Sequence, residues 1–129
     1  NLFSWRYFES PFSRAKFLDQ AIIEDPLKSK FNVVYFFSDI DFSFNAQFMQ
    51  RCRYLGSAKN FVYMPVLHSK YNPNFTGCHN YEDMSEKCGT WRYSGYGAVC
   101  TTKNMYLRAG GFNKDFNDWG KEDVDLYHR

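Results

Sequence analysis

"VVYFFSDIDFSF", residues 33–44, is the stretch that decides the fold. It begins with five consecutive apolar or aromatic residues, Val33 to Phe37, and such a short continuous run is typical of a strand buried on both faces. The run leads directly into two aspartates one residue apart, Asp39 and Asp41. A strand suited to a dry core that ends in paired carboxylates predicts a polar site at the end of the strand.

The segments on either side predict further helices and strands. Upstream, Ser13 is placed to cap a helix over residues 14–24, where apolar residues recur at helical spacing, and Asp25-Pro26 ends this helix. Downstream, we expect a helix at 46–54 and a second strand at 61–66. Residues 68–90 form a polar stretch that is too long for a simple connection, which indicates a functional or lid segment.

The last third of the chain continues the alternation of helices and strands. "YGAVCTT" predicts a third strand, "KNMYLRAGGF" a short helix closed by Gly110 and Gly111, and a final helix should begin near Glu122. There is no repeat, low-complexity tract or internal linker. We therefore expect one α/β unit with a mostly parallel central sheet flanked by helices.

This architecture gives the paired carboxylates a chemical role. In open α/β sheets, ligands bind beyond the carboxyl ends of the strands. If residues 39–41 are extended, Asp39 and Asp41 share one side and Ile40 faces the other. Two carboxylates there suit a divalent cation, which in turn suits a diphosphate. The alternative is a solvated turn. A calcium-binding EF-hand is excluded, because Phe44 and Gln50 occupy the positions that need Gly and Glu.

The second informative stretch is "DWGKEDVDLYHR", residues 118–129. Gly120 breaks the chain, and Glu122, Asp123 and Asp125 then lie in the first turn of a helix, where the helix dipole favours anions. That would explain the acidic residues without any function. The alternative is a sugar site, in which Trp119 offers an apolar face to a sugar ring and the carboxylates accept hydrogen bonds from its hydroxyls.

Composition narrows the class of protein. The chain has 129 residues, is 44% hydrophobic and carries a net charge of +2 with its basic residues scattered, so a nucleic-acid partner is not expected. Its longest apolar run, at 61–67, is far below the roughly 18 residues of a membrane span.

Four cysteines, Cys52, Cys78, Cys88 and Cys100, form no C-x2-C pair. This pattern favours one or two disulfides over a zinc ribbon, with the pairing left open; four reduced core thiols are the alternative. "NFT" at residues 74–76 is an N-glycosylation acceptor sequence, which also favours the secretory route.

Six separated motifs together resemble one known family, the chondroitin synthases and chondroitin N-acetylgalactosaminyltransferases. The motifs are "FSRA" (12–15), "SDIDFSFNAQFMQRCR" (38–53), "VYMPVLHSKYNP" (62–73), "WRYSGYGAVC" (91–100), "AGGF" (109–112) and "DWGKEDVDLY" (118–127). More distantly, the chain is similar to the β-1,4-galactosyltransferases. The resemblance implies a GT-A nucleotide-sugar domain, of which residues 1–129 would be a part truncated at both ends.

The resemblance also implies roles for particular residues. Phe12, Arg14, Asp39 and Gly97 match positions that contact the nucleotide sugar, and Asp41 matches a direct Mn²⁺ ligand. Trp119 and Glu122 match positions that hold sugar, and Asp123 matches the catalytic base. The family's remaining metal ligand, a histidine, would lie beyond Arg129.

The implied reaction is an inverting transfer of N-acetylgalactosamine from UDP-GalNAc to a glucuronate-terminated chondroitin or linkage-region acceptor. The implied setting is the Golgi lumen, within a single-pass type II membrane protein whose anchor lies outside this chain, in a hetero-oligomer with another chondroitin polymerase subunit. Two alternatives stay open: a related transferase with another UDP sugar, and a non-catalytic partner subunit. Lys121 and Asp118 stand where many relatives have Gly, so donor or acceptor preference could differ.

Overall fold

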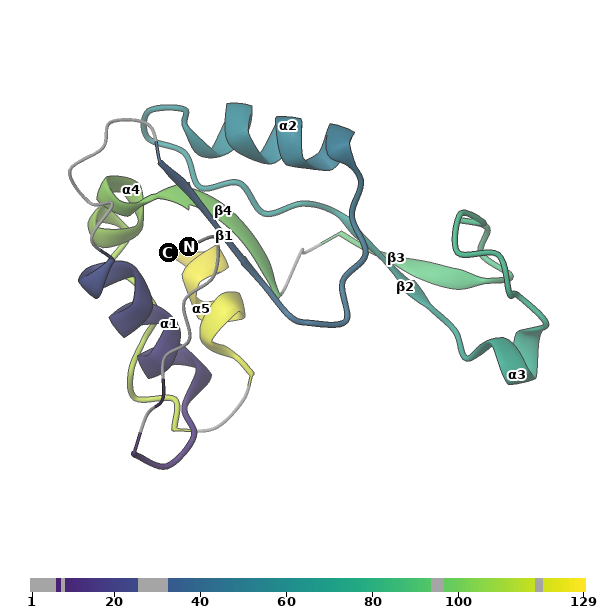
Figure 1. Ribbon diagram of the computed structural model, residues 1–129, viewed down its shortest axis with the longest axis horizontal. Coiled ribbons are helices and arrows are strands. Elements are labelled where there is room, and N and C mark those ends of the chain that lie inside the picture. Colours follow the sequence, from purple (N-terminus) through teal and green to yellow (C-terminus); the bar gives the residue numbers. More distant parts are fainter. Residues whose placement is uncertain (1–6, 8, 26–32, 94–96, 118–119) are drawn as a thin grey trace.

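A computed structural model describes residues 7, 9–25, 33–93, 97–117 and 120–129. They form a helical and stranded body from which a narrow arm, residues 67–92, projects to one side (Figure 1). The elements, in chain order, are α1 (Arg14–Glu24), β1 (Val34–Ser38), α2 (Ala46–Gly56), β2 (Leu67–Lys70), α3 (Pro73–Thr76), β3 (Gly89–Arg92), β4 (Ala98–Thr102), α4 (Lys103–Arg108) and α5 (Glu122–His128).

The mixed α/β class is confirmed, but the expectation of a mostly parallel sheet is wrong for the described part of the chain. β1 pairs with β4 antiparallel, with Phe36 opposite Cys100, and β2 pairs with β3 antiparallel, with His68 opposite Trp91. After β1 the chain passes through α2 and the arm. It then comes back alongside β1 as β4, running in the opposite direction to β1.

The strand predicted at 61–66 is reduced to a single antiparallel bridge between Tyr63 and Cys100. The two residues exchange backbone hydrogen bonds of 3.0 and 2.8 Å. β4 therefore lies between β1 and this segment and runs antiparallel to both. β1 and the segment around Tyr63 therefore run in the same direction, but they do not pair with each other.

Side chains pack on both faces of β1, as its continuous apolar sequence predicts, although only Phe37 is fully buried and the other four residues are half-buried. Alternate side chains of a strand point to opposite faces. The ring of Phe36 packs on Phe44 and Phe48, 5.3 and 5.2 Å between centroids, on the side of α2. The ring of Phe37 packs on Tyr106 and Phe112 on the other side. These two clusters thus cover opposite faces of β1.

The main core lies on the Phe37 side, between the β1–β4 ladder and helices α1, α4 and α5. It contains Ala15, Ile22, Phe37, Val99, Tyr106, Phe112 and Leu126. The predicted helix at 14–24 is confirmed at both ends: Ser13 accepts a hydrogen bond from the Lys16 amide and Asp25 is the C-cap. The predicted end of α4 is also confirmed, because Gly110 and Gly111 adopt positive φ angles of 84° and 65°.

The disulfide expectation is confirmed, and the structure supplies the pairing. Cys52–Cys100 ties α2 to β4, and Cys78–Cys88 closes the far part of the arm. Gly56 lets α2 approach the ladder closely, since a Cβ there would lie 2.8 Å from a Val34 methyl carbon and 3.0 Å from the Cys100 backbone. α2 is therefore fixed to the ladder by a covalent bond and by close packing.

The arm replaces most of the long loop expected at 68–90. Within that range lie β2, the short helix α3 and the start of β3. Its two strands are only four residues long; β2 is half-buried throughout, and β3 is exposed after the buried Gly89. None of the described helices is both long and apolar enough to cross a membrane.

Candidate functional site

Arg14 joins two acidic motifs that are far apart in the sequence. Its Nη2 lies 2.9 Å from Asp39 Oδ1, and its Nη1 donates to Glu122 Oε1 at 2.5 Å. Arg14 is 9% exposed and Glu122 is 1% exposed. One buried guanidinium thus brings together the first turn of α1, the end of β1 and the first turn of α5, and the cluster keeps one net negative charge.

Local structure explains why Arg14 is held at this point. Besides capping α1, the Ser13 hydroxyl donates to the Phe116 carbonyl at 2.9 Å. Three residues after Ser13, Lys16 Nζ donates to Asn117 Oδ1 at 2.9 Å. The start of α1 is therefore fixed against the segment that leads into α5, and the Arg14 guanidinium lies between Asp39 and Glu122.

The carboxylate of Glu122 is only half satisfied. Its Oε2 atom is buried and has no hydrogen-bond donor among the described residues. A buried acceptor without a partner costs about 1–3 kcal/mol, and more when it is charged. The helix dipole alone does not require such burial, so the arrangement fits a carboxylate oxygen kept for a hydroxyl of a ligand.

Asp123 is next to Glu122 but has different partners. It is 8% exposed, and its Oδ1 accepts a hydrogen bond from the Val124 amide at 2.8 Å. The preceding residue, Lys121, has a φ of 74° and its side chain does not cap α5. The first turn of α5 is acidic, which is favourable next to the positive end of the helix dipole. The predicted start of this helix at Glu122 is confirmed.

Gly97 lies against Asp39, at the start of β4. Its φ is 93°, and a Cβ at this position would lie 2.8 Å from Asp39 Oδ2 and 3.2 Å from Phe42 Cζ. Both the backbone conformation and the space therefore require glycine. The family resemblance implies that Gly97 contacts the nucleotide sugar; within the described chain, a side chain at this position would displace Asp39.

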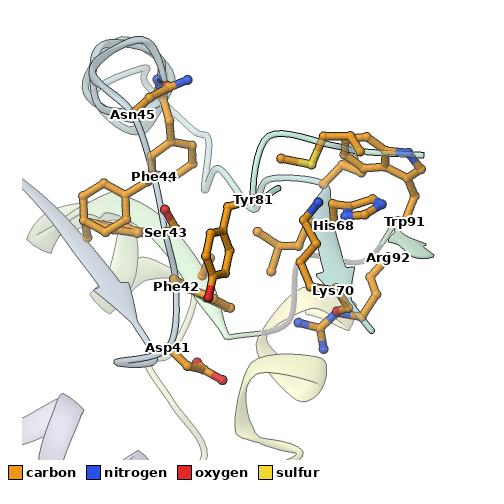
Figure 2. A pocket seen from close by; sticks show the side chains of 17 residues that line it. Asp41, Phe42, Ser43, Phe44, Asn45, His68, Lys70, Tyr81, Trp91 and Arg92 are labelled. Carbon is orange, nitrogen blue, oxygen red and sulfur yellow. Dashed lines mark hydrogen bonds between the residues drawn. The ribbon is translucent and has the colours of Figure 1, made fainter. Parts of the chain in front are cut away.

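Asp41 is separated from the Arg14 cluster and lines a pocket (Figure 2). The expectation that Asp39 and Asp41 share one side of an extended strand is wrong, because β1 ends at Ser38 and Ile40 and Asp41 lie in a turn. Asp39 is bound by Arg14, whereas Asp41 is exposed and has no hydrogen bond or ion pair with any described residue.

The chemistry of Asp41 fits one ligand of a divalent cation. Its carboxylate is a hard oxygen donor that no described residue neutralises, and a Mg²⁺- or Mn²⁺-type site commonly combines one or two carboxylates with substrate phosphates and water. Among the described residues, the metal-binding side chains close enough together to share one ion lie elsewhere, in the arm: Cys78, Asp83 and Cys88. Both of these cysteines are used by the disulfide.

One other predicted site residue among those described is not brought into the cluster. Phe12 is 57% exposed, and its ring contacts Phe17 edge to face at 5.7 Å. Trp119 lies outside the described residues, as does Asp118. Direct contact or close approach does join four of the predicted site residues, Arg14, Asp39, Gly97 and Glu122. Asp123 is adjacent to them in α5.

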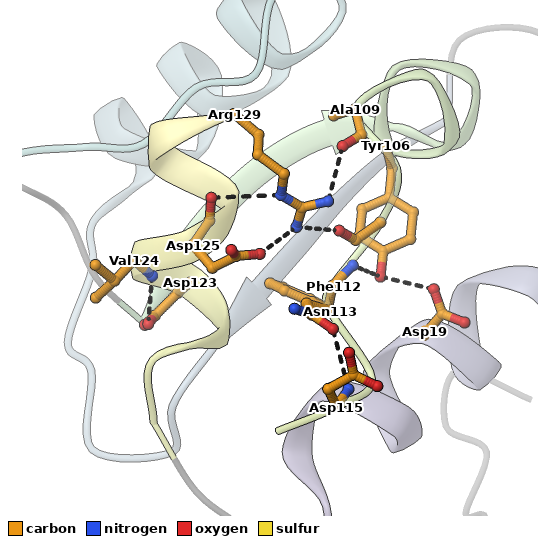
Figure 3. Close-up of polar contacts among 11 residues, drawn as sticks. Asp19, Tyr106, Ala109, Phe112, Asn113, Asp115, Asp123, Val124, Asp125 and Arg129 are labelled. Carbon is orange, nitrogen blue, oxygen red and sulfur yellow. Dashed lines mark hydrogen bonds and ion pairs between the residues drawn. The ribbon is translucent and has the colours of Figure 1, made fainter. Parts of the chain in front are cut away.

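A partly exposed polar network that the sequence analysis missed holds α5 in place (Figure 3). Arg129 donates to the carbonyls of Ala109 and Gly111 at 3.1 and 2.7 Å, and pairs with Asp125 at 2.8 Å. The i,i+4 spacing of Asp125 and Arg129 was the only available sequence signal. The network fixes the far end of α5 to the turn after α4, which orients the first turn that carries Glu122 and Asp123.

Tyr106 continues this support toward α1. Its hydroxyl donates to Asp19 Oδ1 at 3.0 Å and accepts from the Phe112 amide at 2.8 Å. Burial raises the pKa of Tyr106 well above its usual range, with a further contribution from the Asp19 carboxylate. This tyrosine is therefore a neutral connection between α1, which carries Arg14, and the turn after α4, to which Arg129 holds α5.

The pocket beside Asp41 contains further residues that the sequence analysis did not single out. They are Lys70, Tyr81, Trp91 and Arg92, all from the arm. The unusual length of the 68–90 segment was the signal that pointed to this region.

Comparison with known proteins gives a consistent family. The family model described as chondroitin N-acetylgalactosaminyltransferase matches residues 2–129. Human chondroitin sulfate synthase 3 is 42% identical over 98 residues, covering 72% of this chain and 11% of that protein. Human chondroitin sulfate N-acetylgalactosaminyltransferase 1 is 33% identical over 135 aligned positions, covering 98% of this chain and 25% of that protein. The chain thus spans a quarter or less of these relatives, and no solved structure matches it significantly.

Proposed function

Because the chain belongs to the chondroitin N-acetylgalactosaminyltransferase family, we propose that it forms part of an inverting, metal-dependent transferase. The reaction moves N-acetylgalactosamine from UDP-GalNAc to a glucuronate-terminated chondroitin or linkage-region acceptor. The observation that carries the proposal is the Arg14 bridge. Arg14 joins Asp39 to Glu122 in the acidic first turn of α5. Residues expected to contact the donor and residues expected to contact the acceptor therefore belong to one cluster.

In the proposed reaction, Asp123 removes the proton from the acceptor hydroxyl. The hydroxyl oxygen attacks the anomeric carbon of the donor, the bond from that carbon to the diphosphate breaks, and UDP leaves with the electron pair. Configuration inverts, and no covalent intermediate with the protein forms. A divalent cation held by Asp41 would supply compensation for the charge that develops on the diphosphate.

Glu122 and Arg14 have positioning roles in this proposal. The unpartnered Oε2 of Glu122 is available to a hydroxyl of the acceptor sugar, while its Oε1 is held by Arg14. Asp39 is held from the other side of the same guanidinium, near the ribose and diphosphate. Movement of either carboxylate would therefore be transmitted to the other through Arg14.

The proposed location is the Golgi lumen, in a single-pass type II membrane protein. Two disulfides that together use all four cysteines support an oxidising compartment. Assembly with a second chondroitin polymerase subunit is part of the same proposal.

A donor screen with the complete polypeptide tests the activity. UDP release should be fastest with UDP-GalNAc, should require both a chondroitin acceptor and Mn²⁺, and should be unaffected in an Asp115→Asn control, since Asp115 is exposed and outside the cluster. Faster release from another UDP sugar would instead identify a related transferase. Absence of release with every donor, together with retained binding to an active subunit, would identify a non-catalytic partner.

A further inference from the structure

The pocket beside Asp41 lies between the body and the arm, and it is large enough for sugar rings. One wall is the segment from Asp41 to Phe48, and the other is formed by β2, β3 and the arm residues Tyr81 and Met84. Its volume is about 580 Å³. Small-molecule sites in proteins commonly enclose about 300–1,000 Å³ and are lined by aromatic side chains with a few polar groups.

Aromatic rings of the arm face this space. Figure 2 shows Tyr81 facing the segment from Asp41 to Asn45 and Trp91 farther back on the arm side. Tyr81 is 80% exposed and Trp91 is 42% exposed, so both have ring surface available for contact. The Trp91 ring is held by edge-to-face contact with His68 at 4.9 Å. Exposed, oriented aromatic rings of this kind suit the apolar face of a sugar ring.

The charges of the pocket distinguish one kind of sugar. Two cations of the arm line it, Lys70 and Arg92. Lys70 Nζ is engaged by the backbone carbonyl of Asp83. Arg92 is exposed, and its guanidinium forms no hydrogen bond or ion pair with any residue that the structure describes. A guanidinium in this state is suited to a planar carboxylate, which it can bind through two parallel hydrogen bonds.

We propose that this pocket is a subsite for an acidic saccharide, in which Arg92 binds the carboxylate of a uronate residue and Tyr81 and Trp91 contact the sugar rings. The proposal rests on the proposed function, because it assigns a place to the acceptor chain of the same transferase. The location is suitable, since Asp41 at the pocket wall is two residues from Asp39, which the Arg14 guanidinium connects to the acidic turn of α5.

Direct binding tests the subsite separately from catalysis. The probes are a chondroitin hexasaccharide with a terminal glucuronate and the same hexasaccharide after reduction of its carboxyl groups to alcohols. We expect the complete protein to prefer the acidic form, and Arg92→Gln to lower affinity for that form at least about tenfold while leaving the reduced form unchanged. Arg92→Lys should restore part of the preference.

Two controls make the result specific. Arg53→Gln removes an exposed arginine of α2 that does not line the pocket, and it should change neither affinity. UDP binding in the presence of Mn²⁺, followed by calorimetry, should be the same in Arg92→Gln as in the unmodified protein. Circular dichroism verifies that the variants are folded.

The outcomes separate the two proposals. Equal loss of affinity for the acidic and reduced hexasaccharides, or no loss for either, would overturn the role of Arg92. Weakened UDP binding with unchanged hexasaccharide binding would assign Arg92 to the donor diphosphate instead. Carboxylate-selective, Arg92-dependent binding in a protein that releases no UDP from any donor would support the subsite and contradict the proposed catalysis.

Discussion

Glu122 and Asp123 are neighbours in sequence, but their surroundings suit them to different tasks. Successive side chains of a helix point about 100° apart, so the two carboxylates do not easily serve the same hydroxyl. Glu122 is held by Arg14, whereas Asp123 bonds to the amide of its own helix. This difference supports a positioning role for Glu122 and a proton-accepting role for Asp123.

Replacement of the two carboxylates one at a time tests this division. Removal of a general base typically lowers a rate by about 10²- to 10⁴-fold. Asp123→Asn should therefore lower kcat by this amount, while calorimetry finds UDP and Mn²⁺ affinities near those of the unmodified protein. If Asp123→Asn keeps most of its turnover and Glu122→Gln loses it, the roles are reversed.

Gly97 provides a second test at the scale of one residue. In Gly97→Ala, the alanine backbone must keep a positive φ. Its methyl group must also meet the Asp39 carboxylate, which Arg14 holds in place. Backbone strain of this kind costs about 1–3 kcal/mol, measurable by urea unfolding. Because Asp39 must also move, UDP affinity should fall.

Gly77→Ala is the matched control for this substitution. Gly77 has a φ of 71°, but a Cβ there meets no atom within 4 Å. It should therefore lose stability from backbone strain while UDP affinity is unchanged. Equal UDP affinity in the two variants would argue against displacement of Asp39.

Among the elements, those with strong local signals could be predicted from the sequence. The Ser13 cap and the Gly110-Gly111 pair mark the boundaries of α1 and α4 because capping depends on residues a few positions apart. Continuous apolar sequence likewise identified β1. These signals act within one element and need no knowledge of what packs against it.

Pairing between elements could not be predicted in the same way. Tyr63 meets Cys100, and Cys52 meets the same cysteine, through contacts that span tens of residues. The Arg14 bridge is equally long-range, and Arg92 gave no signal that set it apart from other basic residues. The acidic motifs of the candidate site could therefore be predicted, and the family resemblance named Arg14 as a site residue, but the bridge that Arg14 forms between the motifs could not be predicted.

The arm is an element whose order depends on a covalent link. β2 and β3 have four residues each, and short two-stranded hairpins are marginally stable alone. The Cys78–Cys88 bond closes the segment beyond them, with a sequence separation of 10. In a chain-entropy description, a loop of this size contributes about 3 kcal/mol.

Loss of this bond should loosen the arm and leave the body intact. In Cys78→Ser/Cys88→Ser, hydrogen exchange measured by mass spectrometry should accelerate in residues 67–92 and stay unchanged in β1 and α1, since local opening follows the least stable unit. The preference for acidic hexasaccharides should weaken in parallel. Accelerated exchange throughout the body would contradict the independence of the arm.

At the scale of the whole molecule, buried tyrosines should limit stability at alkaline pH. Burial raises the pKa of Tyr35 to about 12, with a contribution from Asp25, and burial also raises the pKa of Tyr106 above its usual range. Unfolded tyrosines titrate near pH 10, about their ordinary value. The folded state therefore binds more protons above that pH, so the stabilisation is complete below about pH 10 and is lost as pH rises toward 12.

This pH dependence can be measured from urea unfolding at a series of alkaline pH values. The free energy of unfolding should fall steadily from about pH 10 upward. Tyr35→Phe removes one of the two groups and should reduce the slope. An identical slope in Tyr35→Phe would show that Tyr35 does not contribute.

The Cys52–Cys100 bond should contribute strongly to the stability of the body. Because it forms only under oxidising conditions, it also bears on the compartment in which the protein folds. Its sequence separation of 48 is much larger than that of the arm disulfide, and it joins α2 to the central ladder. A loop of this size contributes about 4 kcal/mol in the same chain-entropy description, a large share of the roughly 5–15 kcal/mol that stabilises a typical domain.

We therefore expect Cys52→Ser/Cys100→Ser to destabilise the whole body, in contrast to the local effect of the arm variant, and urea unfolding compares the two directly. In material secreted from animal cells, mass spectrometry should find both disulfides and a glycan on Asn74, which is exposed on α3 at the far end of the arm. Four free thiols and an unmodified Asn74 in folded, secreted protein would contradict the luminal assignment. Destabilisation no greater than that of the arm variant would show instead that packing of α2, including the close approach at Gly56, holds it to the ladder without the covalent bond.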